Sequence, residues 1–291
     1  MQAECGGMSN RARAIAEAAL RAVDLGVPRA LHAVGGGDIA AAYRVETESG
    51  RAFLKIGGAS HPFVAEALAL AEIGATKTLR APRVLAHGVA EGAAYLLLEW
   101  IDLAASGDWA AAGRQLAALH ACMQASHGWQ RDNTIGASPQ FNSPCVSWAE
   151  FYRERRLRPQ FALARERRLT PLAALEQEAC RASDALLAGH SPQPSLLHGD
   201  LWRGNLAFDR SGAPVVFDPA AYHGDAETDL AMTRLFGGFP EQFYGAYAEA
   251  RPPAAGAERR LRLYQLYHVL NHANLFGGGY VTQAAALVER L

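Results

Sequence analysis

The chain has 291 residues and a formal net charge of -1, and half of its residues are hydrophobic. No basic field indicates a nucleic-acid or anionic membrane partner. Apolar runs end well before the ~20 residues of a membrane span, so we expect one large domain or two small ones around a substantial core.

The cysteines and the N-terminal residues indicate in which cellular compartment the protein is expected. The first residues lack the charged and then apolar pattern of a signal peptide. The four cysteines form no C-x-x-C pair: Cys5, Cys122, Cys145 and Cys180. This spacing predicts free thiols rather than a zinc site or a disulfide framework, and it favours a cytoplasmic protein.

Residues 1–100 combine short β-type segments with helical periodicity. Apolar residues at helical spacing predict helices over 10–23 and 61–74. Turn residues separate five predicted strands: 29–34, 39–47, 52–56, 83–89 and 93–99. This order predicts a small N-terminal lobe that consists of an antiparallel sheet with one inserted helix.

Residues 101–291 are mainly helical in pattern. The predicted helices cover 108–124, 148–168, 171–187, 226–236, 241–250 and 257–276. Two short strands, 205–208 and 214–217, interrupt them around a Ser-Gly turn. Together the two parts predict an α+β, two-lobed protein-kinase-like fold with a larger, mainly helical C-terminal lobe.

The segment 198–205 reads HGDLWRGN and follows the kinase catalytic-loop pattern H-R-D-x-x-x-x-N, with Gly199 in place of the arginine. Asp200 has the position of the base that accepts the proton of the attacking hydroxyl, and Asn205 that of a magnesium ligand. Asp218 ends the strand VVFD, as the metal-binding aspartate of D-F-G does. The three residues, in this order, predict phosphoryl transfer from ATP with Mg²⁺.

Lys55 in the strand AFLKI resembles the V-A-I-K lysine that holds the α- and β-phosphates. Only two of the 28 basic residues are lysines, Lys55 and Lys77. Because the chain uses arginine almost everywhere, a remaining lysine is expected at a position that needs a compact positive charge. Glu66, on the following helix, is the predicted ion-pair partner of Lys55, and Glu72 on the same helix is the weaker alternative.

Two further segments are expected to bind the nucleotide through their backbone. Gly35, Gly36 and Gly37 form a turn before the Lys55 strand and would place backbone N–H groups over the phosphates. Glu99 and Ile101 lie where the last strand meets the lobe boundary, and their backbone would bond the adenine edge.

These motifs resemble those of the fructosamine kinase (ketosamine-3-kinase) family within the aminoglycoside-phosphotransferase-like kinases. The resemblance extends over nearly the whole chain from Gly35 onward. It rests on GGGDI at 35–39, LHGDLW at 197–202, FDPA at 217–220, DLAMT at 229–233, LFGGF at 235–239, LYQLYH at 263–268 and LNH at 270–272.

The resemblance implies an ATP- and Mg²⁺-dependent kinase that phosphorylates the 3-hydroxyl of ketosamines, the adducts formed when reducing sugars glycate amines. The 3-phosphate then eliminates and frees the amine, and the substrate is free or protein-bound. By resemblance, Trp202 and His272 are substrate-pocket candidates and Asp229 braces the catalytic loop. Four other tryptophans are expected to pack in the interior: Trp100, Trp109, Trp129 and Trp148.

The sequence also departs from the family pattern. Arg203 replaces a small residue and is expected to narrow or charge the mouth of the site. Together with Trp202, two residues after Asp200, it is expected to leave less room beside the acceptor, which favours ribulosamine-type over bulkier fructosamine-type adducts. The segment 222–229 reads YHGDAETD instead of YYGHREAD, which leaves the substrate range open. Asp38 stands where some members have a cysteine, so redox control there is not expected.

Two alternatives stay open from the sequence. One is a kinase of the same fold that acts on an aminoglycoside or an amino alcohol. The other is a catalytically dead nucleotide-binding scaffold, although a scaffold has no need to keep all four of the chemical residues Lys55, Asp200, Asn205 and Asp218.

Overall fold

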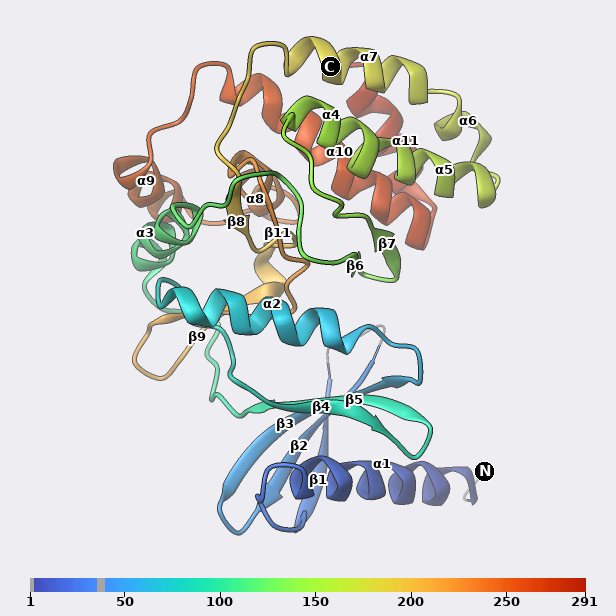
Figure 1. Cartoon of the computed structure of the whole chain (residues 1–291), viewed down its shortest axis with the longest axis vertical. Helices are drawn as coiled ribbons and strands as arrows, with labels where there is room; N and C mark the ends of the chain where they lie inside the picture. The colour runs from blue at the N-terminus through green and yellow to red at the C-terminus, as the bar shows by residue number, and fades with distance from the viewer. Residues whose placement is uncertain (1–2, 36–39) are drawn as a thin grey trace.

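The computed structural model describes residues 3–35 and 40–291, with side chains from Asn10 onward. It confirms the predicted α+β fold, in which an antiparallel sheet with two helices is followed by a larger helical part (Figure 1). Gly36 and Gly37, predicted to contact phosphates, lie outside the described residues, as does Asp38.

The sheet has five antiparallel strands in the order β1-β2-β3-β5-β4. Their bounds are β1 (Ala30–Val34), β2 (Ala41–Thr47), β3 (Gly50–Gly58), β4 (Val84–Ala90) and β5 (Ala93–Glu99). All five predicted strands are present, and the third is longer than predicted. Residues 93–98 of β5 are buried without interruption, which shows that both faces of the sheet are covered.

Two helices cover the two faces of this sheet (Figure 1). Helix α1 (Ala3–Arg21) begins before its predicted start and buries Ile15 and Leu20 against residues such as Leu97. Helix α2 (Phe63–Thr76) packs on the opposite face, where Leu70 contacts the cluster around Leu96. Because neighbouring residues of a strand point to opposite faces, one apolar strand supports both helices.

The second part of the chain contains the remaining helices. They are α3 (Trp109–His120), α4 (Trp148–Tyr152), a π-helical turn (Arg153–Leu157), α5 (Arg158–Glu166), α6 (Thr170–Ala173), α7 (Glu176–Leu186), α8 (Glu227–Thr233), α9 (Glu241–Ala250), α10 (Ala257–Phe276) and α11 (Gly279–Val288). The predicted helix 148–168 is interrupted by the π turn, and the prediction of one continuous helix over 171–187 is wrong. Helix α11 was not predicted.

Three short antiparallel pairs position the loops of this part. They are β6 (Asn133–Ile135) with β7 (Ser138–Gln140), β8 (Ser195–Leu197) with β11 (Tyr222–Gly224), and β9 (Leu206–Phe208) with β10 (Pro214–Val216). Only the β9–β10 hairpin was predicted. The loop 198–205 leaves β8 and enters β9, so both of its ends are anchored. Within the described residues, no helix is long and apolar enough to cross a bilayer.

Candidate active site

A cleft of about 1250 Å³ lies between the sheet and the helical part and contains the predicted chemical residues. Lys55 and Glu66 line it from one side, and Asp200, Asn205 and Asp218 from the other. Residues far apart in the sequence thus meet in one place.

Lys55 is held between two carboxylates. Its Nζ donates to Glu66 Oε1 at 2.9 Å and to Asp218 Oδ1 at 2.8 Å. Burial alone would lower the pKa of Lys55, but the carboxylates of Glu66 and Asp218 raise it above its usual value. The lysine is therefore charged at neutral pH. Glu72 instead accepts the indole N–H of Trp129 at 2.6 Å, which confirms Glu66 as the partner.

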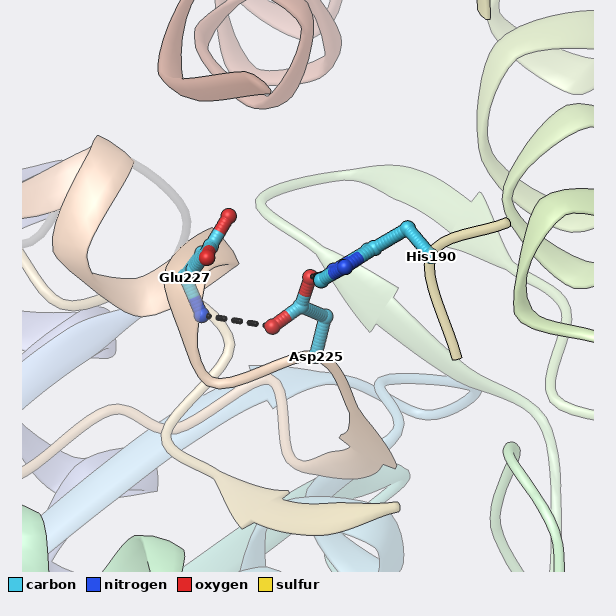
Figure 2. A group of neighbouring side chains, drawn as sticks. All are labelled: His190, Asp225 and Glu227. Carbon is cyan, nitrogen blue, oxygen red and sulfur yellow. Dashed lines mark hydrogen bonds and ion pairs between the residues drawn. The ribbon is translucent and has the colours of Figure 1, made fainter. Parts of the chain in front are cut away.

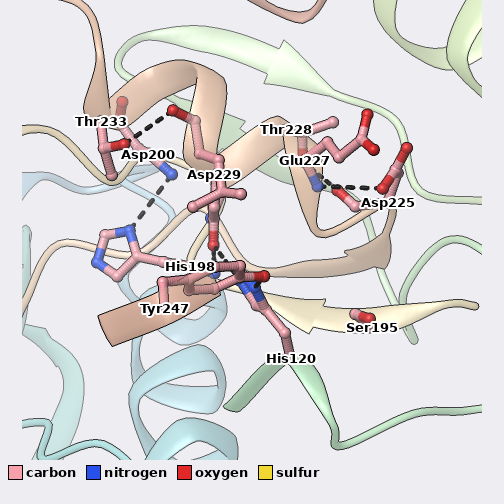
Figure 3. Close-up of polar contacts among 12 residues, drawn as sticks. His120, Ser195, His198, Asp200, Asp225, Glu227, Thr228, Asp229, Thr233 and Tyr247 are labelled. Atoms are coloured by element: carbon pink, nitrogen blue, oxygen red, sulfur yellow. Dashed lines mark hydrogen bonds and ion pairs between the residues drawn. The ribbon is translucent and has the colours of Figure 1, made fainter. Parts of the chain in front are cut away.

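The loop 198–205 is braced by Asp229 on α8 (Figure 3). Its carboxylate accepts the backbone N–H groups of His198 and Gly199 at 2.8 and 2.9 Å and the Nε2–H of His120 at 3.1 Å. Although burial opposes it, these hydrogen bonds lower the pKa of Asp229. A carboxylate with three donors is a rigid support, as predicted.

Gly199 has φ +82°, and a Cβ there would lie 2.1 Å from the carbonyl oxygen of Ala220. Only glycine fits this position. The arginine that protein kinases carry here is therefore excluded by the close approach of two backbone segments.

Asp200 faces the cleft beside Asn205. The Nδ2 of Asn205 donates to the backbone oxygen of Asp200 at 2.9 Å and to its Oδ2 at 3.3 Å. Burial raises the pKa of Asp200 to about 7, and the carboxylates of Asp218 and Asp229 act in the same direction. A carboxyl group with a raised pKa has the basicity that suits proton acceptance from an alcohol.

Asp218 follows β10 with φ +55°, an uncommon conformation for a residue other than glycine. The preceding residue fixes it, because the Phe217 N–H donates to Asn205 O and the Phe217 carbonyl lies 3.0 Å from His198 Nε2. The amide oxygen of Asn205 and the carboxylate of Asp218 are hard oxygen ligands. This donor set fits Mg²⁺.

The segment that joins the sheet to the helical part also lines the cleft. Gly35, Glu99 and Ile101, the candidate nucleotide-binding residues, all belong to the lining. Trp100 also lines the cleft, so the expectation that it only packs in the interior is wrong. Its Nε1 donates to Asp102 at 2.7 Å, and the Arg51 guanidinium lies 5.6 Å from its ring.

Trp202 and His272, the substrate-pocket candidates, also line the cleft. Sequence reasoning missed three aromatic residues there: Phe236, Phe276 and Tyr280. The available signal was that Phe236 precedes two glycines and Phe276 precedes three, a combination typical of sharp turns.

The prediction that Arg203 narrows or charges the mouth of the site is not supported. Arg203 lies outside the cleft lining, and its guanidinium sits 5.0 Å from the ring of Trp109. It therefore does not narrow the site.

The segment 222–229 also lies outside the cleft lining. Its Asp225 accepts the backbone N–H of Glu227 at 3.0 Å and His190 Nε2–H at 2.6 Å (Figure 2). Asp225 also accepts the Tyr264 hydroxyl at 2.7 Å, and Glu227 forms an ion pair with Arg260 at 2.7 Å. These polar groups form hydrogen bonds and an ion pair with one another in the interior. The departure thus changes a structural network rather than the substrate-facing surface.

Free thiols are also confirmed among the described residues. Cys122, Cys145 and Cys180 form no disulfide, whereas the side chain of Cys5 lies outside the described part.

Comparison with known proteins gives a consistent result over nearly the whole chain. The sequence profile described as "Fructosamine kinase" matches residues 11–291. A "probable ketoamine kinase" of Synechocystis sp. is 46% identical over 262 residues, which cover 88% of both chains. A chloroplastic "protein-ribulosamine 3-kinase" of Arabidopsis thaliana is 40% identical over 269 residues, which cover 88% of this chain and 80% of that protein.

Solved structures agree with this result. A protein of Haemophilus somnus 129PT that is assigned to the fructosamine-3-kinases has a TM-score of 0.86 and 28% identity, and the match covers 94% of this chain and 95% of that chain. The aminoglycoside phosphotransferase APH(4)-Ia has a TM-score of 0.63 at 17% identity, with 96% and 99% covered. The second likeness concerns the fold alone.

Proposed function

This chain belongs to the fructosamine kinase family, and we propose that it transfers a phosphoryl group from ATP to the 3-hydroxyl of ketosamines. The relatives named for ketoamine or ribulosamine phosphorylation match almost the full length of the chain. The observation that carries the proposal is the meeting of Lys55, Asp200, Asn205 and Asp218 in one cleft. A ketosamine kinase accounts for all of them.

Each residue has a role that follows from its position. Asp200 accepts the proton of the acceptor hydroxyl and orients its oxygen. Lys55, kept charged by Glu66, neutralises phosphate oxygens. Glu99 and Ile101 offer backbone groups to the adenine edge. Because phosphoryl transfer needs little covalent help from the protein, this positioning accounts for most of the catalysis.

Asn205 and Asp218 would hold Mg²⁺, which would supply positive charge to the phosphates. The Asn205 amide is already oriented, since its Nδ2 is bound to Asp200. Asp218 is the more exposed of the two Lys55 partners, with 49% of its side chain accessible. Its carboxylate is thus open to the cleft for a cation.

The test is a substrate panel of ribulosamine, fructosamine, an aminoglycoside and an amino alcohol, each assayed for ADP formation with ATP and Mg²⁺. We expect turnover of ketosamines, with ribulosamine used more readily because Trp202 lies two residues from the base. Release of the free amine after the reaction would identify the 3-hydroxyl as the acceptor, because only the 3-phosphate eliminates in this way.

Other outcomes separate the alternatives. Turnover of only the aminoglycoside or amino alcohol would reject the ketosamine assignment but keep the kinase. Nucleotide binding without any turnover would indicate a scaffold. We also propose a cytoplasmic location, which is consistent with free cysteines and with the need for ATP.

A further inference from the structure

Helix α2 carries two glutamates that bind different partners. Glu66 accepts the Lys55 ammonium at 2.9 Å. Glu72 instead accepts the indole N–H of Trp129 at 2.6 Å. Because Glu72 follows Glu66 by six residues, roughly 240° around an α-helix, the two side chains leave the helix on different faces. Helix α2 thus connects the lysine of the sheet to the helical part of the chain, and Figure 1 shows it between the two.

The indole that binds Glu72 belongs to a packed residue. Trp129 is 4% exposed and lies in one apolar cluster with Ala65 and Ala69 of α2. Its backbone N–H donates to the carbonyl oxygen of Asn142 at 2.9 Å. The indole N–H is therefore offered to Glu72 from the interior and not from an exposed side chain that could follow the helix.

The residue before Trp129 connects this contact to the strands beside the loop 198–205. Gly128 exchanges two backbone hydrogen bonds with His223 of β11, each at 2.8 Å. Strand β11 pairs with β8, which leads into the loop that carries Asp200. Gly128 has φ +115°, a backbone conformation that favours glycine. Helix α2 is thus connected through Trp129 to the strand pair that holds this loop.

The contact between Glu72 and Trp129 is a hydrogen bond between a carboxylate and a buried donor, a strong type. The side chain of Glu72 is 31% exposed, and its Oε1 lies 3.8 Å from His223 Nε2, which is beyond hydrogen-bond distance. Burial lowers the pKa of His223 to about 4, so this ring is neutral at pH 7 and forms no ion pair there. The indole N–H is therefore the group that fixes Glu72.

The position of α2 determines how the Lys55 ammonium is shared between two carboxylates. Its Nζ donates to Glu66 on α2 at 2.9 Å and to Asp218, after β10, at 2.8 Å. A shift of α2 by about one ångström would stretch only the bond to Glu66 beyond hydrogen-bond length. Lys55 would then pair with Asp218 alone, although a kinase-type lysine needs its helix glutamate in place to hold the phosphates.

Resting on the proposed function, we propose that Glu72 and Trp129 are positioning residues whose hydrogen bond, which we call the α2 latch, holds Glu66 against Lys55 and thereby sets the affinity for ATP. Neither residue of the latch lines the cleft, so both act through Glu66. The KM for the ketosamine is set by other residues and should not depend on the latch.

The test is Trp129→Phe, which removes the N–H and keeps an apolar ring. We expect the Kd for ATP, measured by titration calorimetry without acceptor, to rise about 10-fold or more, the effect of a lost hydrogen bond to a charged group. The KM for ATP should rise with it, while the KM for the ketosamine changes little. Glu72→Gln keeps an acceptor oxygen and should therefore lose less affinity than Glu72→Ala.

Trp148→Phe is the matched control. Trp148 lies in the same apolar cluster, is 2% exposed, and donates its indole N–H to the Tyr264 hydroxyl at 2.9 Å, away from α2. Both variants lose one buried indole hydrogen bond, so urea denaturation should show a lower free energy of unfolding for both. Only Trp129→Phe should weaken ATP binding, which separates positioning from a general loss of stability.

A double-mutant cycle tests whether the latch acts through Glu66. In a Glu66→Ala chain, α2 no longer offers Lys55 a carboxylate, so the position of the helix should not matter. Adding Trp129→Phe to this chain should then change the Kd for ATP by less than about twofold. The full loss in both backgrounds would show that Trp129 affects ATP binding by another route.

Two results would overturn the inference: equal ATP affinities of the Trp129→Phe and Trp148→Phe chains, or additive effects of Glu66→Ala and Trp129→Phe. The proposed function fails on a different measurement, because it is rejected if the wild-type chain phosphorylates no ketosamine. A wild-type chain that binds ATP but phosphorylates another alcohol would still test the latch through its Kd for ATP. The two failures are therefore distinguishable.

Discussion

At the scale of single residues, Lys55 sits in a space shaped by two carboxylates. Its side chain is 14% exposed, and its Nζ contacts oxygens at 2.8 and 2.9 Å. A guanidinium is planar and larger, so it does not fit where one ammonium bonds both acids. We predict that Lys55→Arg loses almost as much kcat/KM as Lys55→Met.

The matched control is Lys77→Arg, at the other lysine of the chain. Lys77 is exposed at the C-terminus of α2, and its backbone N–H donates to the carbonyl oxygen of Gly74. Its side chain is therefore replaceable, and Lys77→Arg should leave activity unchanged. A Lys55→Arg variant with wild-type activity would show that the site needs only a positive charge.

A substitution of Asp200 tests whether this residue is the base that accepts the proton of the acceptor hydroxyl. We predict that Asp200→Ala lowers kcat by ~10²–10⁴-fold while nucleotide binding stays near normal, because the base acts on the acceptor hydroxyl and not on the nucleotide. Turnover by single-point assay and ATP affinity by titration calorimetry would measure the two effects separately. More than about a tenth of the wild-type activity in this variant would remove Asp200 from the mechanism.

At the scale of elements, the π turn before α5 has a chemical cause. Pro159 lacks the N–H that would bond the carbonyl of Arg155 in an α-helix, and Arg156 Nη1 donates to that carbonyl at 2.9 Å instead. Arg156 is fully buried and also donates to Phe141 O at 2.7 Å and Asn142 Oδ1 at 2.8 Å. Its guanidinium lies 3.9 Å from the Tyr222 ring centroid.

These bonds hold the segment after β7, and we predict that Arg156→Met destabilises the chain by roughly 2–4 kcal/mol, because buried acceptors lose their donors. Urea denaturation would measure the change. The control is Arg158→Met two residues on, where an exposed arginine pairs weakly with Glu154 at 3.5 Å. Equal stabilities of the two variants would show that methionine packing offsets the lost hydrogen bonds.

The elements that the sequence predicts correctly are those marked by residues close to them in the chain. The five strands are bounded by turns, and the chemical residues follow a motif whose spacing is set by one loop. The breaks near Pro159 and in the segment 171–187 were missed because apolar periodicity continues across them. Helix α11 was missed because its start depends on Gly277 and Gly278, whose unusual conformations depend on packing against α10.

Local sequence patterns are also insufficient to identify every residue that lines the cleft. Lys55, Asp200, Asn205 and Asp218 could be placed from sequence because each belongs to a motif. Phe236 and Tyr280 could not, because an aromatic residue at helical or turn spacing looks the same in a core and in a cleft. Only tertiary packing decides which ring faces are exposed.

At the scale of the whole molecule, polar contacts join the sheet to the helical part around the cleft. Asp102 bonds Arg51 of β3 at 2.9 Å and also Arg210, after β9, at 2.9 Å. On the other side, Glu72 of α2 accepts from Trp129 at 2.6 Å. These contacts bridge the two parts whose side chains, Lys55 and Asp200 among them, line the cleft.

Buried histidines predict how the stability of this assembly depends on pH. Burial lowers the pKa of His127 and His223 to about 4 and that of His268 to about 3. The unfolded chain binds these protons near pH 6.5, so between pH 6.5 and 4 it holds more protons than the folded chain. The free energy of unfolding should therefore fall as the pH falls through this window.

Neighbouring groups modify this trend without reversing it. Burial raises the pKa of Asp200 to about 7 and also raises the pKa values of Glu66 and Glu227, and these three groups act in the opposite direction. Burial lowers the pKa of three further histidines, His61, His198 and His272, so six histidines oppose three carboxyl groups. Glu72 lies 3.8 Å from His223, and Asp225 favours the charged form of His127. The lowered pKa values of Asp225 and Asp229 add a further loss of stability only below about pH 4.

Urea denaturation at several values between pH 7.5 and 4.5 would measure this dependence. His127→Gln and His223→Gln remove two of the groups, so the double variant should show a flatter dependence on pH even if its stability at pH 7.5 is lower. His87→Gln, at an exposed position of β4, should keep the wild-type slope. A wild-type free energy of unfolding that stays constant or rises as the pH falls to 4.5 would contradict the prediction, because it would mean that these histidines gain protons as readily in the folded chain as in the unfolded one.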